Sequence, residues 1–298
     1  RPLFADLAHD GKLVIIAGTA VVDSADGSVK WTGDQRYDFY KVSTVADLNL
    51  DGNPAVIDGY QAYNADGTLR WRNTSIPPDP GLNAVARFGD DPYPAVVLER
   101  GTSISPVLYL LDHDGKILWG PVNINTSNWS VFSQPVVADV DGDGESEILV
   151  KGADYLFAYD KNGNVKHSYS IPGDLYLDRV YAPTVFDLNG DGNPEVLISA
   201  NGYFRILDGK SGALLYEEPT YMGGYGWGVE GHVQQHVIVA DIDGDGQAEI
   251  VVSGYYGVKV YGSKNQDWVG SRKIWTQDDY HVTNVNDDGT IPQYESPP

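Results

Sequence analysis

Short apolar runs separated by polar, glycine-rich turns dominate the hydrophobic pattern of this chain. Residues 148–150 and 250–252 are aliphatic, and Asp, Gly or Ser residues bound both runs closely. Runs of this length, rich in β-branched residues and flanked by turn residues, are typical of β-strands. No segment of comparable length shows the apolar spacing of an amphipathic helix. The pattern therefore predicts an all-β protein.

Paired strands with a tight turn are the next feature of the pattern. In residues 62–71 and 108–119, two β-rich runs flank an Asp-Gly turn, and residues 204–216 repeat the arrangement. An Asp-Gly pair between two such runs is a strong short-range signal for a hairpin. A tryptophan follows the turn in several units, and we expect these residues to pack in the core: Trp31, Trp71 and Trp119.

An internal repeat organises these strands. Three segments align without gaps, at residues 137–150, 185–198 and 239–252, and a weaker copy lies at residues 45–57. Degenerate copies complete the series at residues 6–11, 87–92 and 284–289. The first position of each copy falls at 6, 47, 87, 139, 187, 241 and 284, so that the period is 40 to 54 residues.

That period is typical of a propeller blade. We therefore predict a β-propeller with four-stranded blades, with seven blades favoured and six as the alternative. The whole chain, residues 1–298, would form a single propeller domain whose last blade is incomplete, because the seventh copy begins close to the C-terminus.

The repeated loop carries the pattern D-x-[DN]-x-D-G-x-x-E, which suits calcium. Calcium takes six to eight oxygen ligands, and side chains at loop positions 1, 3 and 5 can converge on one ion. The Gly at position 6 permits the sharp turn, and a carboxylate at position 9 can close the site. The candidate ligands of the three complete loops are Asp139, Asp141, Asp143 and Glu147; Asp187, Asn189, Asp191 and Glu195; and Asp241, Asp243, Asp245 and Glu249.

The remaining loops depart from the pattern. The loop of Asp47, Asn49 and Asp51 has Ala55 at the closing position, so it should bind calcium more weakly. Arg87 places a cation where a ligand should be, and we predict no metal in that loop. The alternative for every loop is a turn capped by Asx hydrogen bonds, with no ion at all. Magnesium is disfavoured because it requires stricter octahedral geometry.

Composition narrows the classes of partner. The chain has no cysteine and a net charge of −22, so it lacks thiolate metal sites and repels nucleic acid and anionic membrane surfaces. No run of about 18 apolar residues is present, which argues against membrane insertion. The chain opens as a strand entering a loop, so we expect it to be part of a larger protein.

The segment from Val137 to Gly144, followed by an apolar strand, resembles the FG-GAP/VCBS repeat family. Integrin α-subunit propellers and some fungal lectins have similar repeats. The resemblance covers nearly the whole chain and implies a calcium-binding β-propeller that is secreted or displayed at the cell surface. It does not specify a function, because this fold supports many.

The connections between blades are long and rich in aromatic residues. Flat aromatic faces stack on sugar rings, and neighbouring polar groups bind hydroxyls, which predicts carbohydrate binding on this face. The alternative is that the aromatics fill gaps between blades. The candidate ligand-binding residues are Trp129, Tyr176, Tyr221, Tyr225, Trp227 and His232.

Two functions remain open. A non-catalytic binding or adhesion module, recognising glycan or a surface protein, fits the repeats and the lack of a catalytic constellation. The alternative is a polysaccharide lyase, which needs a base and a cation that neutralises a uronate carboxylate. His232, Tyr225 and Arg179 could supply these groups. We favour the module that is not an enzyme.

Overall fold

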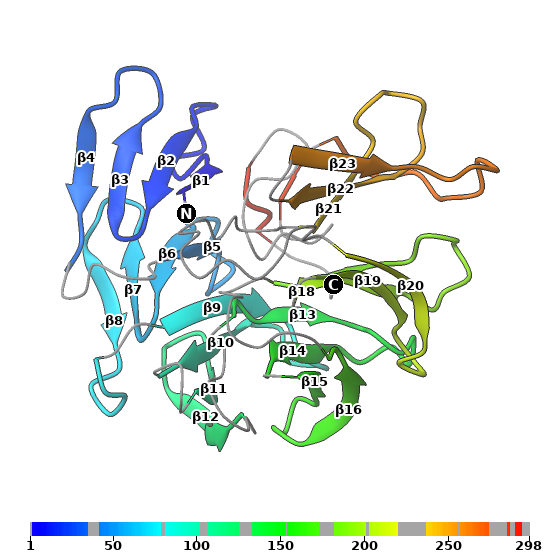
Figure 1. Ribbon diagram of the computed structural model, residues 1–298. Helices are drawn as coiled ribbons and strands as arrows, with labels where there is room; N and C mark the ends of the chain where they lie inside the picture. Colours follow the sequence, from blue (N-terminus) through cyan, green and yellow to red (C-terminus); the bar gives the residue numbers. More distant parts are fainter. Residues whose placement is uncertain are drawn as a thin grey trace, which may run out of the picture. The chain divides into compact units, whose positions relative to one another are not determined.

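The computed structural model describes most of the chain and contains only strands, turns and loops in that part (Figure 1). The described residues are 2–34, 42–78, 81–101, 106–124, 133–152, 154–172, 182–200, 203–219, 237–254, 257–273, 285–286 and 290–293. Within them, no helix is long and apolar enough to cross a membrane.

The strands form six antiparallel sheets, in which neighbours along the chain pair with each other. Three sheets lie in a first compact unit, which comprises residues 1–125, 161–164 and 276–298. Their strands are β1 (Pro2–Ala5), β2 (Val14–Ala17), β3 (Ala20–Asp23) and β4 (Val29–Thr32); β5 (Thr44–Ala46), β6 (Ala55–Asp58), β7 (Gln61–Asn64) and β8 (Leu69–Arg72); and β9 (Gly81–Ala86), β10 (Ala95–Arg100), β11 (Val107–Leu111) and β12 (Ile117–Asn123).

Three further sheets lie in a second unit, which comprises residues 126–160 and 165–275. Their strands are β13 (Val136–Ala138), β14 (Glu147–Lys151), β15 (Tyr155–Tyr159) and β16 (Val165–Ser170); β17 (Thr184–Phe186), β18 (Glu195–Ala200), β19 (Tyr203–Asp208) and β20 (Leu214–Pro219); and β21 (Val237–Ala240), β22 (Glu249–Gly254) and β23 (Gly257–Tyr261).

This is a β-propeller, and the predicted all-β class and four-stranded blades are confirmed. Five sheets have four strands each, and the sixth has three within the described residues. The blade count stays a prediction, because most of the seventh repeat, at residues 284–289, lies outside the described residues. The prediction of a single domain also stays a prediction.

Burial follows strand position within each blade. The second strands β10, β14 and β18 are buried along their whole length, whereas the fourth strands β12 and β20 are largely exposed. A strand that is covered on both faces needs apolar side chains at consecutive positions, and this explains the unbroken aliphatic runs of the sequence. One core cluster joins β13–β16 with β17–β19 in the second unit, through residues such as Leu149 and Val196.

The tryptophans that follow the hairpin turns are half-buried, which differs from the predicted core positions. Trp31 donates its indole N–H to the carbonyl of Ala65, 2.9 Å away, and Trp71 donates to His113. Each ring lies against the hairpin turn of the next repeat. These positions lie on the fourth strands, which leaves each ring partly exposed, and Trp71 also packs against the buried core cluster that β5–β7 form with β9–β11.

Candidate functional site: the acidic loops between first and second strands

In each of the six sheets the acidic loop, or its degenerate copy, connects the first strand to the second. The position-1 aspartate accepts hydrogen bonds from main-chain N–H groups of its own loop. Asp187 accepts from Gly190 and Asp191 at one oxygen and from Gly192 at the other, over 2.8–3.2 Å. The Asx hydrogen bonds of the alternative interpretation are therefore present.

The same cap forms where calcium ligation is impaired. Asp6 accepts from Ala8, Asp10 and Gly11, although Ala8 stands at the middle ligand position of that loop. The cap of the first aspartate thus requires no metal-binding pattern. It shapes the turn, and it is compatible with an ion as well as with none.

Two left-handed residues shape the five loops that begin with Asp6, Asp47, Asp139, Asp187 and Asp241. Position 6 of these five loops is glycine, with φ between 79° and 91°, whereas the Arg87 loop has Pro92 there. Position 4 is also left-handed: Gly142, Gly190 and Gly244 stand there in the complete loops, and His9 and Leu50 stand there in the degenerate ones, with φ of 52° and 59°. Because a side chain costs about 1–2 kcal/mol in this region, the degenerate loops carry local strain.

The position-9 glutamate caps the loop from the opposite side. Glu147 accepts the N–H of Val140, Glu195 accepts that of Leu188 and Glu249 accepts that of Ile242, at 2.8–3.0 Å. Each glutamate uses one oxygen in this bond. The other oxygen remains available for an ion or a cation, which is how a single side chain can serve both the turn and a metal.

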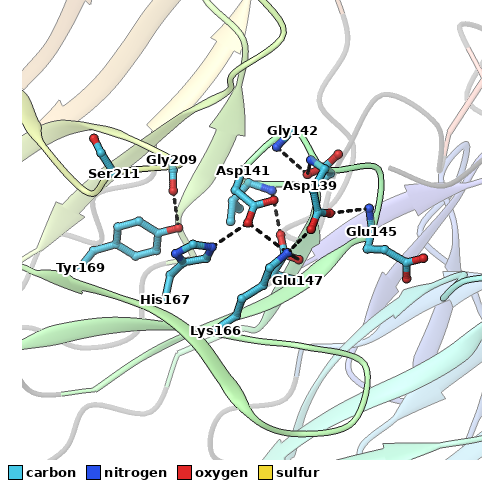
Figure 2. Close-up of polar contacts among 12 residues, drawn as sticks. Asp139, Asp141, Gly142, Glu145, Glu147, Lys166, His167, Tyr169, Gly209 and Ser211 are labelled. Atoms are coloured by element: carbon cyan, nitrogen blue, oxygen red, sulfur yellow. Dashed lines mark hydrogen bonds and ion pairs between the residues drawn. The ribbon is translucent and has the colours of Figure 1, made fainter.

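We refer to each complete acidic loop, together with the side chains that contact it, as a corner named after its position-1 aspartate. The Asp139 corner contains a lysine. Lys166, on the outer strand β16, places its Nζ 3.0 Å from Asp141, 2.6 Å from Asp143 and 2.8 Å from Glu147 (Figure 2). His167 Nε2 lies 2.7 Å from the same oxygen of Asp141 that Lys166 contacts, Oδ2. The other oxygen of Asp141, Oδ1, is buried and has no hydrogen-bond partner in the described part of the chain.

These contacts perturb the ionisation of the Asp139 corner. Desolvation lowers the pKa of Lys166, but the hydrogen bonds that its ammonium donates to Asp143, Glu147 and Asp141 outweigh it and hold that pKa above its ordinary value. The hydrogen bond from Lys166 is also the main reason that the pKa of Asp143 is lowered. Burial raises the pKa of Glu147 despite the neighbouring lysine. The ammonium group is therefore the charge that holds three carboxylates together.

The Asp187 corner has the same backbone and no such cation. In the described part of the chain, no Lys, Arg or His side chain is paired with Asp187, Asp191 or Glu195. Burial raises the pKa of Glu195, and the charges of Asp187 and Asp191 add to this shift. No cation among the described residues therefore compensates the negative charge at this corner.

The Asp241 corner is intermediate. Ligand oxygens of Asp241, Asp243 and Glu249 lie within 4.8 Å of one another, as do those of Asp139, Asp141 and Glu147. Among the described residues, the cation paired with this corner is Lys273, which is 64% exposed and lies 3.5 Å from a single oxygen of Asp241. Oxygen-only clusters of this size have the chemistry that calcium requires.

Side-chain hydrogen bonds hold the incomplete loops of Asp47 and Arg87. In the Asp47 loop, the Asn49 amide donates to Asp51 over 2.8 Å, and Gln293, from near the C-terminus, donates to the Leu50 carbonyl. In the Arg87 loop, the guanidinium donates to the carbonyl of Asp91. Whether either loop takes an ion stays a prediction.

All six candidate ligand-binding residues lie outside the described residues: Trp129, Tyr176, Tyr221, Tyr225, Trp227 and His232. The structure instead contains buried charged residues that the sequence interpretation missed, at the ends of second strands and on β19. Glu99, Arg100, Lys151 and Arg205 are each at most 9% exposed. The available signal was a charged residue that closes an aliphatic run, as in Val150-Lys151.

Comparison with known families supports the repeat in one part of the chain. Residues 187–252, which contain the Asp187 and Asp241 loops, match the model of the FG-GAP-like repeat. No curated protein sequence matches the chain significantly.

Solved structures share the fold at low sequence identity. The V. cholerae biofilm matrix protein Bap1 is 17% identical, with a TM-score of 0.74 over 99% of this chain and 74% of its own. The exotype rhamnogalacturonan lyase YesX and the Bacillus licheniformis rhamnogalacturonan lyase PL11 are each 19% identical over 93% of this chain, with TM-scores of 0.56 and 0.53. The chain spans 48% and 57% of the two lyases.

Proposed function

We propose that the chain is a calcium-stabilised binding or adhesion module, secreted or displayed at a cell surface, that recognises glycan or another surface protein. The observation that carries the calcium part is the Asp241 corner, where three carboxylates converge within 4.8 Å. Like charges at this separation repel, and a divalent ion would remove that repulsion. Calcium would supply charge neutralisation and rigidity at the blade corners, with no role in chemistry.

The residues that would hold the ion are those predicted from the sequence at loop positions 1, 3, 5 and 9. At the Asp187 corner they are Asp187, Asn189, Asp191 and Glu195, and at the Asp241 corner they are Asp241, Asp243, Asp245 and Glu249. The glutamates also keep their hydrogen bonds to Leu188 and Ile242. The position-1 and position-9 side chains are thus held in place before an ion arrives.

The adhesion part draws on fold similarity and charge. Bap1, which shares the fold along nearly the whole chain, is a biofilm matrix protein. A net charge of −22 favours neutral glycans or basic protein surfaces over nucleic acid and anionic membranes. The aromatic connections predicted from the sequence would supply the stacking surface.

Binding to glycan arrays and to bacterial exopolysaccharide, in calcium and in excess chelator, tests the proposal. We expect binding without product release. Trp129→Ala and Trp227→Ala should weaken it, whereas Tyr155→Ala, which alters an exposed residue of β15 outside the predicted connections, should not. Thermal melting in the same buffers tests calcium binding separately. A free calcium concentration of a hundred times the Kd would stabilise the folded protein by about 2.7 kcal/mol for each bound ion. An unchanged Tm in chelator would refute the calcium part.

A rhamnogalacturonan or other acidic-polysaccharide lyase is the second candidate, because two lyases share the fold over 93% of the chain. β-Elimination produces an unsaturated uronate with new ultraviolet absorbance. The appearance of that absorbance with an acidic polysaccharide would favour the lyase over the binding module. His232→Ala should then abolish it.

A further inference from the structure

The three complete acidic loops share one sequence pattern, but they differ in whether a neighbouring cation neutralises their negative charge. The Asp139 corner is compensated by Lys166, whereas the Asp187 corner has no paired cation among the described residues. The loops themselves are alike in backbone, in the position-1 cap and in the position-9 cap. The difference therefore comes from another strand.

That strand is the fourth of each blade, and the register identifies the position. In the β15–β16 pair, Lys166 lies in the bulge between the pairs Tyr159–Val165 and Ala158–His167. In the β19–β20 pair, Leu215 lies in the bulge between the pairs Leu207–Leu214 and Ile206–Tyr216. Lys166 and Leu215 thus occupy equivalent positions in neighbouring blades of the second unit.

We infer that Lys166 is a tethered cation that takes the place of calcium at the Asp139 corner, so that calcium is held at the Asp187 and Asp241 corners and excluded from this one. The inference rests on the proposed calcium binding. It assigns the three loops unequal roles, although their sequences predict three equal sites.

The contacts of Lys166 account for the exclusion. Its ammonium lies within 3.0 Å of loop positions 3, 5 and 9, which are the side chains that would otherwise converge on the ion. An incoming ion would have to displace three charge-assisted hydrogen bonds. The lysine side chain is 27% exposed, so solvent screens these bonds only in part. An intramolecular cation is also present at a fixed effective concentration, whatever the calcium level.

The corner retains the capacity to bind calcium once the lysine is removed. Oδ1 of Asp141 is buried and lacks a partner, and Asp139, Asp141 and Glu147 place ligand oxygens within 4.8 Å of one another. Lys166→Leu copies the neighbouring blade and should convert the corner into a calcium site. Leu215 is 55% exposed, and Leu215→Lys should place an ammonium group beside the carboxylates of the Asp187 corner and exclude calcium there.

Equilibrium dialysis of the purified chain against radioactive calcium tests the inference. Relative to wild type, we expect one more ion per chain in Lys166→Leu and one fewer in Leu215→Lys. Asp143→Asn should leave the wild-type count unchanged and should remove the extra ion from Lys166→Leu. Circular dichroism and melting in calcium verify that each variant folds.

The outcomes separate the inference from the proposed function. If neither wild type nor Lys166→Leu binds calcium, the proposed function fails in its calcium part and the inference fails with it. If wild type binds calcium, and Asp143→Asn in the wild-type background lowers the count by one, only the inference is overturned. Equal counts in wild type and both exchange variants would also overturn it.

Discussion

The indole nitrogen of Trp71 donates a hydrogen bond to the main-chain carbonyl of His113, 3.1 Å away and 42 residues along the chain. The bond joins the outer strand β8 of one blade to the hairpin turn of the next. Gly115 in that turn leaves no room for a side chain, because a Cβ there would lie 2.5 Å from the Trp71 ring. The outer rim of the first unit is therefore held by a tryptophan that packs against a glycine.

Gly115→Ala should destabilise the protein more than Gly27→Ala. Both glycines lie in hairpin turns with φ of 78° and 74°, but a Cβ at Gly27 meets nothing within 4 Å. Gly27→Ala should therefore destabilise the protein only by the cost of placing an alanine in the left-handed backbone region, which is about 1–2 kcal/mol. Gly115→Ala adds the overlap with Trp71, for a total of about 2–4 kcal/mol. Urea unfolding of the two variants measures the difference, and equal losses would contradict the packing argument.

Variants of the position-1 aspartates can distinguish the stability that comes from the turn-capping hydrogen bonds from the stability that comes from bound calcium. Asp6→Ala removes three main-chain hydrogen bonds from a loop that lacks the middle ligand. We expect a loss of about 1–2 kcal/mol that is the same in calcium and in chelator.

Asp187→Ala removes an equivalent cap together with a proposed calcium ligand. It should lower Tm more in calcium than in chelator, because only the calcium-bound protein loses the ion. Melting curves of the two variants in both buffers provide the measurement. A calcium-dependent effect of Asp6→Ala would show that the degenerate loop binds metal.

The sequence predicted those parts of the fold that depend on local pattern. Aliphatic runs located the second strands, and Asp-Gly turns located the hairpins, since both signals lie within a few residues. Position 6 of the acidic loop also followed from local chemistry, because glycine recurs there and is left-handed in the five loops that begin with an aspartate.

The role of Lys166 could not be predicted in the same way. The lysine lies 19 residues from Glu147, and the two meet only because a bulge in the β15–β16 hairpin sets the register. Trp71 is a related case. Apolar composition favours burial, and the ring does pack against a core cluster of the first unit, but composition does not reveal that the hairpin turn of the next repeat also lies against it.

The second unit contains a half-buried glutamate, Glu218, that should make stability depend on pH. Glu218 on β20 is hydrogen-bonded by Lys259, by Tyr261 at 2.7 Å and by Tyr216 at 2.8 Å. These contacts, led by the one with Lys259, lower the pKa of Glu218 to about 2. The ordinary pKa of a glutamate is about 4.3, so the ionised form favours the folded state.

The stabilisation by Glu218 should be complete above about pH 4.3 and should disappear as the pH falls towards 2. Glu218→Gln should therefore lower Tm at pH 6 and match wild type near pH 2. The effect will be small, because Glu218 is 31% exposed and Lys259 is 52% exposed. Lys259→Met removes the largest cause of the pKa shift. In the Lys259→Met background, the Tm difference at pH 6 between the protein with Glu218 and the Glu218→Gln variant should therefore be smaller. Melting curves from pH 2 to pH 6 measure these differences, and a gap between wild type and Glu218→Gln that widens towards low pH would contradict the assignment.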